Sequence, residues 1–528
     1  MPRFAAIDVG SNALRLRIVE ADGSSRAPSA QLALLHEPLS PWRDIVSLRA
    51  PVRLGGEVFQ TGRLTPASIG QACAALKDFR RQMDDAKVTS YRATATSAVR
   101  EAQNGATLVE RARREAGIDL DVIEGVEEAR LIQLAVGRRI PIDDQRVLLI
   151  DVGGGSTELT ALDHGESTFS ISLPVGAVRL IEAYLREAST IDREHTGLIR
   201  EAIDRALVEA RPHLASATFD ALIGTGGNVE TLAELCPLRG APIPTVDVAA
   251  AKHLFVKMSA MPAAERARAF GLRMDRADTL VPATAIFLRL AELFGVSSIL
   301  SPGVGLKDGI LEELVDRYFK VWDAAREAEG VLTACARVGA RYDFDARHGE
   351  LVMHLAARLF DDLRHEHGLG ERDRLLLRAA ALLHDIGDFV RYDGHHKHSH
   401  YLILHADIMG LTPDERAIVA NVARYHRKSV PDASHPNFRD LDKDARAKVR
   451  ALAAILRIAD ALDREHLGKV KDVRGEVDVT RGRLLLTVAG DEERELEEWT
   501  VRAKSGLLKD VFGLEVELIP RPAARPVA

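Results

Sequence analysis

The stretch LLIDVGGGSTELT at residues 148–160 decides the fold of this chain. Its apolar run ends at Asp151, breaks into three glycines and continues with alternating side chains, which is typical of strand, tight turn and strand. Glycines allow the backbone N–H groups of such a turn to converge on phosphate oxygens. Asp151 and Glu158 flank the turn, where carboxylates can hold a divalent cation against the same phosphate. The pattern predicts a phosphate-binding hairpin formed by Gly153, Gly154, Gly155 and Ser156.

A second copy of this pattern lies near the N-terminus. Residues 4–12, FAAIDVGSN, repeat the apolar strand, the aspartate Asp8, the Val-Gly pair and the hydroxyl residue Ser11. Two copies in register predict two related lobes. The duplication resembles the actin, hexokinase and sugar-kinase superfamily of ribonuclease H-like lobes, in which the ligand lies in the cleft between lobes. We expect Ser11 and Asn12 to face the turn of residues 153–156, and Asp8 to assist Asp151 and Glu158 in holding the metal.

A third glycine turn, GTGGN at residues 224–228, follows an apolar strand and precedes a helix. It predicts a further backbone approach to phosphate at Gly226, although close packing of helix on strand would need the same glycines.

The length of 528 residues predicts three to four domains. We expect lobe I over residues 1–130, lobe II over 131–315, an all-α HD-like domain over 316–475 and a small α/β appendage over 476–528, ending in a disordered tail at 521–528.

The composition is that of an ordinary globular protein, with 46% hydrophobic and 28% charged residues. The net charge of −7 argues against a general nucleic-acid binder. No apolar run reaches the length of a membrane span and no signal peptide precedes the first strand, so we expect no integral membrane segment and a cytoplasmic location. The three cysteines lack metal-site spacing and indicate neither a disulfide framework nor a zinc-thiolate site.

Two charged groups are candidates for catalysis in the cleft. Arg92 and Arg100 flank a small, polar loop after a strand, and Arg92, at the strand end, is predicted to clamp a phosphoryl group. The alternative is solvated surface charge. Glu127 and Glu128 begin the helix that crosses towards the second lobe, where acidic residues favour the helix dipole by about 0.5 kcal/mol each without any further role. A general base at this helix start could also reach a water above a bound phosphate.

The helical part of the chain concentrates the histidines. His348, the pair His384 and Asp385, and Asp460 resemble the ligand pattern of an HD-type metal phosphohydrolase domain, in which separate helices supply histidine and carboxylate. This predicts a possible second divalent metal; the alternative is that the fold persists without metal. The same part also carries a cationic stretch that could guide a polyanion, and its residues are Arg391, His396, Lys397, His398, Arg427 and Lys428.

The ordered set of motifs resembles the exopolyphosphatase and guanosine pentaphosphate phosphohydrolase family, in its long form. The resemblance rests on residues 7–12, 93–100, 125–131, 151–158 and 224–227, and on 394–399 and 424–428 in the helical part. It implies that Glu128 is the catalytic base, that Mg²⁺ is required, and that orthophosphate is released from a polyphosphate end. It also implies a cytoplasmic enzyme that is frequently a homodimer. The sequence does not choose between Mg²⁺ and Mn²⁺.

We therefore interpret the chain as a Mg²⁺-dependent exopolyphosphatase. Glu128 takes the proton of water, Arg92 adds positive charge and the polymer follows the cationic stretch. The nearest alternative is removal of the terminal 5′ phosphate of guanosine pentaphosphate at the same site. Others are catalysis at the His384–Asp385 cluster, a non-enzymatic sensor of alarmone or polyphosphate, and a kinase. Asn12–Arg15 and Asn228 depart from the family pattern at the expected cleft floor, where substrate preference is set.

Overall fold

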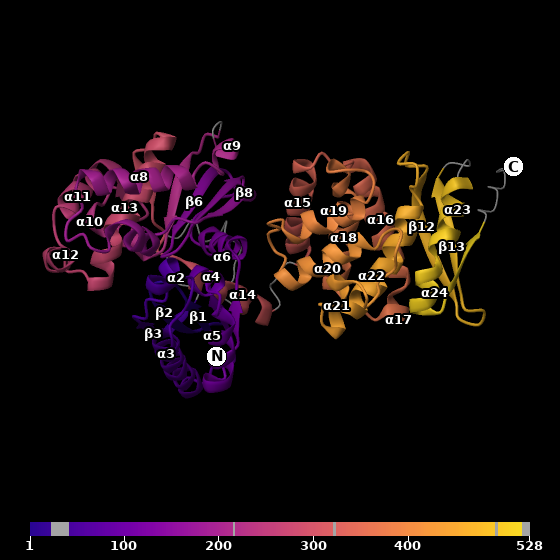
Figure 1. Ribbon diagram of the computed structural model, residues 1–528, viewed down its shortest axis with the longest axis horizontal. Coiled ribbons are helices and arrows are strands. Elements are labelled where there is room, and N and C mark those ends of the chain that lie inside the picture. Colours follow the sequence, from indigo (N-terminus) through magenta and orange to yellow (C-terminus); the bar gives the residue numbers. More distant parts are fainter. Residues whose placement is uncertain (23–41, 215–216, 320–323, 491–494, 520–528) are drawn as a thin grey trace. The chain divides into compact units, whose positions relative to one another are not determined.

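The computed structural model describes residues 1–22, 42–214, 217–319, 324–490 and 495–519. The chain forms two compact units, Met1–Trp322 and Asp323–Ala528, which are described separately (Figure 1). The predicted tail at 521–528 lies outside the described residues. The finer division into four domains stays a prediction.

The first lobe is built on a five-stranded sheet in the order β3-β2-β1-β4-β5. Its strands β1, β2 and β3 form an antiparallel meander, and β4 and β5 add parallel strands beside β1. The bounds are β1 (Arg3–Val9), β2 (Leu14–Glu20), β3 (Arg43–Ala50), β4 (Ser90–Ala95) and β5 (Leu120–Val122). Four helices accompany the sheet: α2 (Gly55–Thr61), α3 (Pro66–Asp85), α4 (Ser97–Glu101) and α5 (Gly105–Ala116).

Local chemistry explains where these elements begin and end. Thr65 caps α3 by accepting a hydrogen bond from the Ser68 amide, and Pro66 takes the first helical position, where its missing N–H costs no hydrogen bond. Strand β3 ends at Ala50, because the next residue, Pro51, has no N–H to donate to a neighbouring strand. Apolar side chains of the sheet and of α3 and α5 then close one core, which includes Ile7, Leu76 and Leu108.

The second lobe repeats the plan of the first. Its sheet has the order β10-β11-β9-β6-β7-β8, with β6, β7 and β8 as an antiparallel meander and β9 parallel to β6. The strands are β6 (Arg146–Val152), β7 (Thr157–Asp163), β8 (Glu166–Leu173), β9 (Ala221–Thr225), β10 (Thr245–Asp247) and β11 (Ser298–Leu300). The helices are α7 (Ala177–Leu180), η2 (Ile181–Leu185), α8 (Arg193–Ala206), α9 (Arg211–Leu214), α10 (Gly227–Leu235), α11 (Val248–Ser259), α12 (Ala263–Ala269) and α13 (Met274–Phe294).

Two helices, α6 (Gly125–Gly137) and α14 (Leu306–Tyr318), connect the lobes. They pack so closely that a side chain at Gly309 would overlap the backbone of Leu131. The predicted border between the lobes at 130/131 falls inside α6. The helix α6 therefore runs from one lobe to the other, and its first turn, which includes Glu128, lies at the edge between them.

The second unit is helical over residues 324–461. Its elements there are α15 (Ala324–Arg341), α16 (Ala346–Asp362), α17 (Arg364–His367), α18 (Glu371–Leu383), η3 (Ile386–Phe389), α19 (His395–Leu404), α20 (Pro413–Arg424), α21 (Pro436–Arg439) and α22 (Lys443–Ala461). A three-stranded sheet follows, formed by β12 (Val470–Asp478), β13 (Arg483–Gly490) and β14 (Glu515–Ile519), with α23 (Glu495–Lys504) and α24 (Gly506–Phe512).

Sheet and helices of this unit share one hydrophobic core. Val470 and Val473 of β12, Leu484 of β13 and Val501 of α23 belong to the same buried cluster as the side chains of α16, α18 and α22. The small α/β segment at the end of the chain thus packs as part of the helical unit (Figure 1). No helix in the described residues is long and apolar enough to cross a membrane.

Candidate active site

The two glycine hairpins of the first unit are each closed by an equivalent backbone hydrogen bond. The amide of Gly10 donates to the Ala13 carbonyl at 3.1 Å, and the amide of Gly153 donates to the Ser156 carbonyl at 3.0 Å. The hairpins also meet in space, since a Cβ at Gly154 would lie 2.9 Å from the Cβ of Ser11 and 3.5 Å from the Asn12 nitrogen. A Cβ at Gly155 would collide with the side chains of Phe59 and Ser97. The sequence prediction that the two turns face each other is confirmed.

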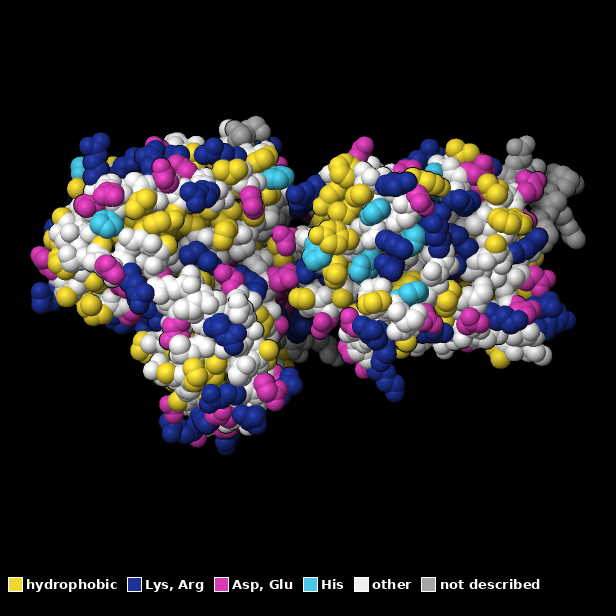
Figure 2. All heavy atoms as spheres, in the orientation of Figure 1, with side chains coloured by type: hydrophobic (Ala, Val, Ile, Leu, Met, Phe, Trp, Pro, Cys, Tyr) yellow, Lys and Arg dark blue, Asp and Glu magenta, His cyan; other side chains and the backbone are white. Residues whose placement is uncertain are grey.

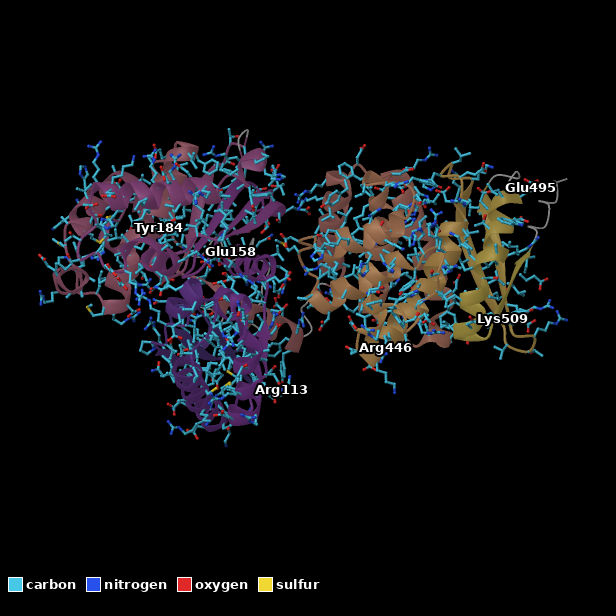
Figure 3. All side chains as sticks on the ribbon, in the orientation of Figure 1. Arg113, Glu158, Tyr184, Arg446, Glu495 and Lys509 are labelled. Carbon is cyan, nitrogen blue, oxygen red and sulfur yellow. The ribbon has the colours of Figure 1, made fainter. Side chains whose placement is uncertain are left out.

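Three carboxylates gather beside these turns. Glu128 of α6, Asp151 of β6 and Glu158 of β7 each offer an oxygen, and these atoms lie within 4.8 Å of one another. Figure 3 labels Glu158, which lies deep in the first unit where its two lobes meet. Thr225 Oγ1 donates to Asp151 Oδ1 at 2.6 Å, and Ser172 Oγ donates to Glu158 Oε1 at 2.8 Å. One oxygen each of Glu128 and Glu158 is buried without a hydrogen-bond partner among the described atoms.

The electrostatics of this group are those of crowded, buried acids. Burial, and then the charge of the neighbouring Asp151, raise the pKa of Glu158 to about 7 against the hydrogen bonds from Ser156 and Ser172. Burial, and then the charges of Glu158 and Asp151, raise the pKa of Glu128 well above its ordinary value. Burial also raises the pKa of Asp151. Such a group gains most from a bound cation, and its all-oxygen donors fit the preference of Mg²⁺.

Arg100 is the functional candidate that sequence reasoning passed over. Its charge lowers the pKa of both Glu128 and Glu158 and so opposes the rise that burial causes. Arg100 belongs to α4, and its Nη1 donates to the carbonyl of Ile123 at 2.6 Å, just before α6. The sequence did contain a signal for Arg100, because this residue flanks the same polar loop as Arg92.

Arg92, which the sequence predicts to clamp a phosphoryl group, makes ion pairs with three carboxylates, and the clamp stays a prediction. Its guanidinium is taken up by Glu313 at 2.6 Å, Asp121 at 2.8 Å and Glu127 at 3.1 Å. Arg130 pairs with the same Glu127 and Glu313. Arg92 therefore belongs to an ion-pair network that ties β4 to α6 and α14.

The two predicted cleft residues of the first hairpin, Ser11 and Asp8, have different partners. Ser11 Oγ is 2.9 Å from Ser97 Oγ. Asp8 is buried but stays outside the group of three, with its Oδ2 2.7 Å from Arg15 Nη1. Strand register explains this difference, because Arg15 faces Asp8 across the first hairpin as Glu158 faces Asp151 across the second.

The phosphate contacts at Gly153 and Gly226 stay predictions. In this structure the Gly153 amide donates to the Ser156 carbonyl within the hairpin, and the Gly226 amide donates to the Val304 carbonyl at 3.3 Å. Gly226 instead supports Asp151, since its φ of 82° brings its α-carbon so close that a Cβ would lie 3.1 Å from Asp151 Oδ1. Within the described structure, the amides of Gly154, Gly155 and Ser156 make no backbone hydrogen bond.

In the second unit, the four predicted metal ligands come together. His348 Nε2 lies 3.2 Å from His384 Nε2, and these two histidines form a possible ligand group with Asp460. Asp385 is within 3.4 Å of His384. Sequence reasoning missed His395, His426 and His466, which lie against the same Asp385.

The cationic stretch is less uniform than predicted. Arg391 and Lys397 are exposed and His398 is half-buried, and Figure 2 shows Lys, Arg and His side chains gathered on one face of this unit. Arg427 and Lys428 line a pocket together with Asp385 and Asp460. His396 needs correction: it is buried, and burial, with the charge of His395, lowers its pKa to about 4, so it is neutral at physiological pH.

Comparison with known proteins identifies the family. A profile of the Ppx/GppA phosphatase family matches residues 36–318, and a profile of domain III of that family matches residues 332–516. The guanosine-5'-triphosphate,3'-diphosphate pyrophosphatase of Vibrio parahaemolyticus is 26% identical over 434 residues, which cover 81% of each chain. The protein of the same name from Aeromonas hydrophila is 25% identical over 462 residues, which cover 87% of each chain.

A solved structure, that of an exopolyphosphatase from Cytophaga hutchinsonii, matches with a TM-score of 0.53 and 26% identity. The match covers 60% of this chain and 98% of that chain. The two lobes with their glycine hairpins are therefore the actin-like fold of this family. Fold, profiles and relatives agree: the chain belongs to the Ppx/GppA phosphatase family and is a phosphoanhydride hydrolase.

Proposed function

We propose that the first unit removes the terminal 5′ phosphate of guanosine pentaphosphate as orthophosphate. The observation that carries the proposal is the buried group of Glu128, Asp151 and Glu158 beside two abutting glycine hairpins. A phosphoanhydride is cleaved through a loose transition state, so the protein mainly positions a water in line and neutralises charge on the phosphoryl oxygens. The cluster and the hairpins together offer the groups for both tasks.

The hairpins supply the binding groups. The amides of Gly154, Gly155 and Ser156 hold the terminal phosphate from one side, with Ser11 and Asn12 opposite. Arg100 adds positive charge from α4. Since backbone amides are fixed by the hairpin, they stabilise the developing charge without reorganising.

The carboxylates fit a divalent cation. Asp151 and Glu158 would hold Mg²⁺, or Mn²⁺, with Asp8 as a nearby charge; all donors are oxygens, and one Glu158 oxygen lacks a hydrogen-bond partner among the described atoms. The bound ion would supply Lewis-acid polarisation of the phosphoryl oxygens. Glu128 takes the proton of the attacking water. Arg100 favours the ionised form of Glu128 that this step needs.

The choice of guanosine pentaphosphate over inorganic polyphosphate rests on the names of the relatives. The curated relatives from Vibrio and Aeromonas are named for guanosine-5'-triphosphate,3'-diphosphate, which supports this substrate over the polymer that the sequence alone favoured. Exopolyphosphatase activity is the second candidate. It is favoured by the name of the solved Cytophaga structure and by the exposed cations Arg391, Lys397 and Lys428. A homodimer and a cytoplasmic location stay predictions.

A side-by-side substrate panel tests the choice. Purified full-length protein with Mg²⁺ is given guanosine pentaphosphate or long-chain polyphosphate, and orthophosphate release is measured as kcat/KM. We expect the nucleotide to be preferred at equal concentration of chain ends. A higher kcat/KM for polyphosphate would establish the second candidate. Binding of either compound without orthophosphate release would instead indicate a sensor.

The role of Glu128 is tested by Glu128→Gln. We expect kcat to fall about 10²–10⁴-fold, because the amide cannot accept the proton of the attacking water, while substrate binding is largely retained. Glu166→Gln, on the exposed start of β8, is the matched control and should keep wild-type kcat. Near-normal turnover by Glu128→Gln would mean that another group is the base.

A further inference from the structure

The start of α7 holds the carbonyl groups of the second glycine hairpin. The amide of Ala177 donates to the Gly153 carbonyl at 3.0 Å, and the amide of Val178 donates to the Gly154 carbonyl at 2.8 Å. Amides in the first turn of a helix have no acceptor within that helix, so they are free to bind the hairpin. Two carbonyls of the turn are therefore fixed by backbone groups.

The third carbonyl of the turn is held by a side chain. Arg179 Nε donates to the Gly155 carbonyl at 2.7 Å. The amide of Arg179 also donates to the Gly154 carbonyl, at 3.0 Å, so the same residue contacts the turn twice. The hydrogen bond from Nε, unlike those from backbone amides, can be removed by a substitution.

The three carbonyls set the direction of the amides that are assigned to phosphate. The carbonyl of one residue and the N–H of the next belong to one planar trans peptide group and point in opposite directions. The carbonyls of Gly153, Gly154 and Gly155 therefore fix the N–H groups of Gly154, Gly155 and Ser156, in this order. Since residues of α7 bind the carbonyls, the three N–H groups point away from α7.

Gly176 allows this close approach of α7 to the hairpin. A Cβ at Gly176 would lie 2.6 Å from the oxygen of Gly154 and 2.7 Å from the carbonyl carbon of Gly155. Such distances are shorter than van der Waals contact, so a larger residue would push α7 away from the turn. The hydrogen bonds to the carbonyls depend on this approach.

Arg179 is itself anchored by the first lobe. Its Nη2 donates to the two carboxylate oxygens of Glu101 at 2.6 and 2.8 Å. Its guanidinium carbon lies 4.1 Å from the centre of the Phe59 ring, which is a cation–π contact. Glu101 belongs to α4 and Phe59 to α2, and Figure 1 shows both helices at the edge of the first lobe that faces the second.

A guanidinium suits this place because it makes all of these contacts at once. Its donors lie in one rigid plane, so Nε can bind a carbonyl while Nη2 binds a carboxylate and the flat face stacks on a ring. The Phe59 ring also packs against the turn, since a Cβ at Gly155 would lie 2.3 Å from its Cζ. Hairpin, ring and guanidinium thus form one packed group that spans the two lobes.

We propose that Arg179 is a positioning residue of the phosphate site. It orients the peptide group between Gly155 and Ser156, and Glu101 and Phe59 of the first lobe hold it in that orientation. The inference rests on the proposed function, because this hairpin is the one that binds the terminal phosphate. Arg179 acts through the Ser156 amide, from the side of the turn opposite to that amide.

The orientation of the Ser156 amide matters most in the transition state. Negative charge on the phosphoryl oxygens is then stabilised by donors that already point at it and need not reorganise. Without Arg179, the peptide group between Gly155 and Ser156 can rotate, and its donor must be reoriented during the reaction. Loss of Arg179 should therefore lower kcat more than it raises KM.

The kinetic test uses full-length protein with Mg²⁺ and, in parallel, guanosine pentaphosphate and polyphosphate. Arg179→Met should lower kcat about 10–100-fold and change KM less than about threefold. Arg186→Met is the matched control, because Arg186 is exposed at the end of η2 and donates to Gln60 of the first lobe at 2.9 Å. This control should keep wild-type kcat. Circular dichroism checks folding, and folded Arg179→Met with wild-type kcat overturns the proposal.

Glu101→Gln tests whether the first lobe acts through Arg179. We expect kcat to fall about 3–10-fold, because the amide holds the guanidinium less firmly than the carboxylate does. The double variant Arg179→Met/Glu101→Gln should be no slower than Arg179→Met, since Glu101 has nothing left to hold. Losses that multiply in the double variant would show that Glu101 acts independently and would overturn this coupling.

Hydrogen–deuterium exchange separates this inference from the proposed function, because it needs no substrate. In the ligand-free full-length protein, the peptide of residues 150–160 should exchange faster in Arg179→Met than in wild type, and Arg186→Met should not change it. Unchanged exchange in Arg179→Met, or equal acceleration in Arg186→Met, overturns the inference. A wild type that releases no orthophosphate from either substrate overturns the proposed function instead, and exchange still decides whether Arg179 holds the hairpin.

Discussion

The carboxylate group of the first unit and the histidine cluster of the second both gather possible metal ligands, but they do so with different donor atoms. In the first unit, Glu128, Asp151 and Glu158 offer only oxygens, and the phosphate-binding groups are backbone amides of glycine turns. In the second unit, imidazole nitrogens surround Asp385, and the cations are side chains such as Arg427 and Lys428. The comparison teaches that donor chemistry, more than burial, separates the two sites, because both are buried.

Metal exchange is expected to have the largest effect and can break this comparison. Chelation should abolish orthophosphate release from guanosine pentaphosphate by the full-length protein. Added Mg²⁺ should restore this release, since hard oxygen donors suit Mg²⁺, whereas the histidine cluster should retain Mn²⁺ in equilibrium dialysis, since imidazole ligands favour transition metals. Equal retention of Mg²⁺ by the histidine cluster would remove the distinction.

Arg100 and Arg92 sharpen the comparison within the first unit. Arg100→Met should lower kcat for phosphate release by about 10²–10³-fold, because a charge next to the developing phosphoryl charge is lost. The matched variant Arg92→Met should keep kcat within a few-fold and instead lower the free energy of unfolding by about 1.5–3 kcal/mol, since it removes charged hydrogen bonds to Glu313 and Glu127. Steady-state kinetics and urea unfolding separate the two. The reverse pattern would restore Arg92 as the phosphate clamp.

Asp463 tests how the second unit orients its ligands. Asp463→Asn should weaken Mn²⁺ binding by about 10–100-fold, since the carboxylate that fixes the tautomer of His348 is lost. Titration calorimetry of the full-length protein gives the affinity. Guanosine pentaphosphate hydrolysis in the first unit should stay unchanged. Unaltered Mn²⁺ affinity would show that His348 is not a ligand.

Gly155 is expected to give the smallest effect on the comparison. Gly155→Ala places a methyl group against Phe59 and Ser97, so we expect a loss of about 1–3 kcal/mol in the free energy of unfolding together with weaker phosphate binding. Gly197→Ala, inside α8 where nothing lies within 4 Å of the added Cβ, should instead stabilise the protein by about 0.5–1 kcal/mol. A neutral Gly155→Ala would argue against a tight meeting of the hairpins.

Much of the first site could be predicted because it is local. The residues of each hairpin are adjacent in sequence, so their turn chemistry and flanking carboxylates are visible without coordinates, and the repeat indicates that two turns face each other. The partners of an arginine are not local. Arg92 and Arg100 flank one loop, and only the packing of α6 and α14 shows that Glu313 takes Arg92 while Arg100 stays near Glu128.

The second site shows the same limit more strongly. His384 and Asp385 are neighbours in the chain and could be named from sequence, whereas His395 and His426 join them only through the packing of α19 and α20. His395 and His396 are adjacent, yet the helix directs them about 100° apart, so one faces Asp385 and the other is buried as a neutral side chain.

By itself, then, the sequence determined the family, the duplicated lobes, the two glycine hairpins and the carboxylates beside them, since each depends on residues a few positions apart. Only the tertiary structure decided which arginine reaches the site, which amides remain available to phosphate and which histidines surround Asp385. Those outcomes depend on contacts between distant segments, and no spacing along one chain encodes the distances that helix and sheet packing impose.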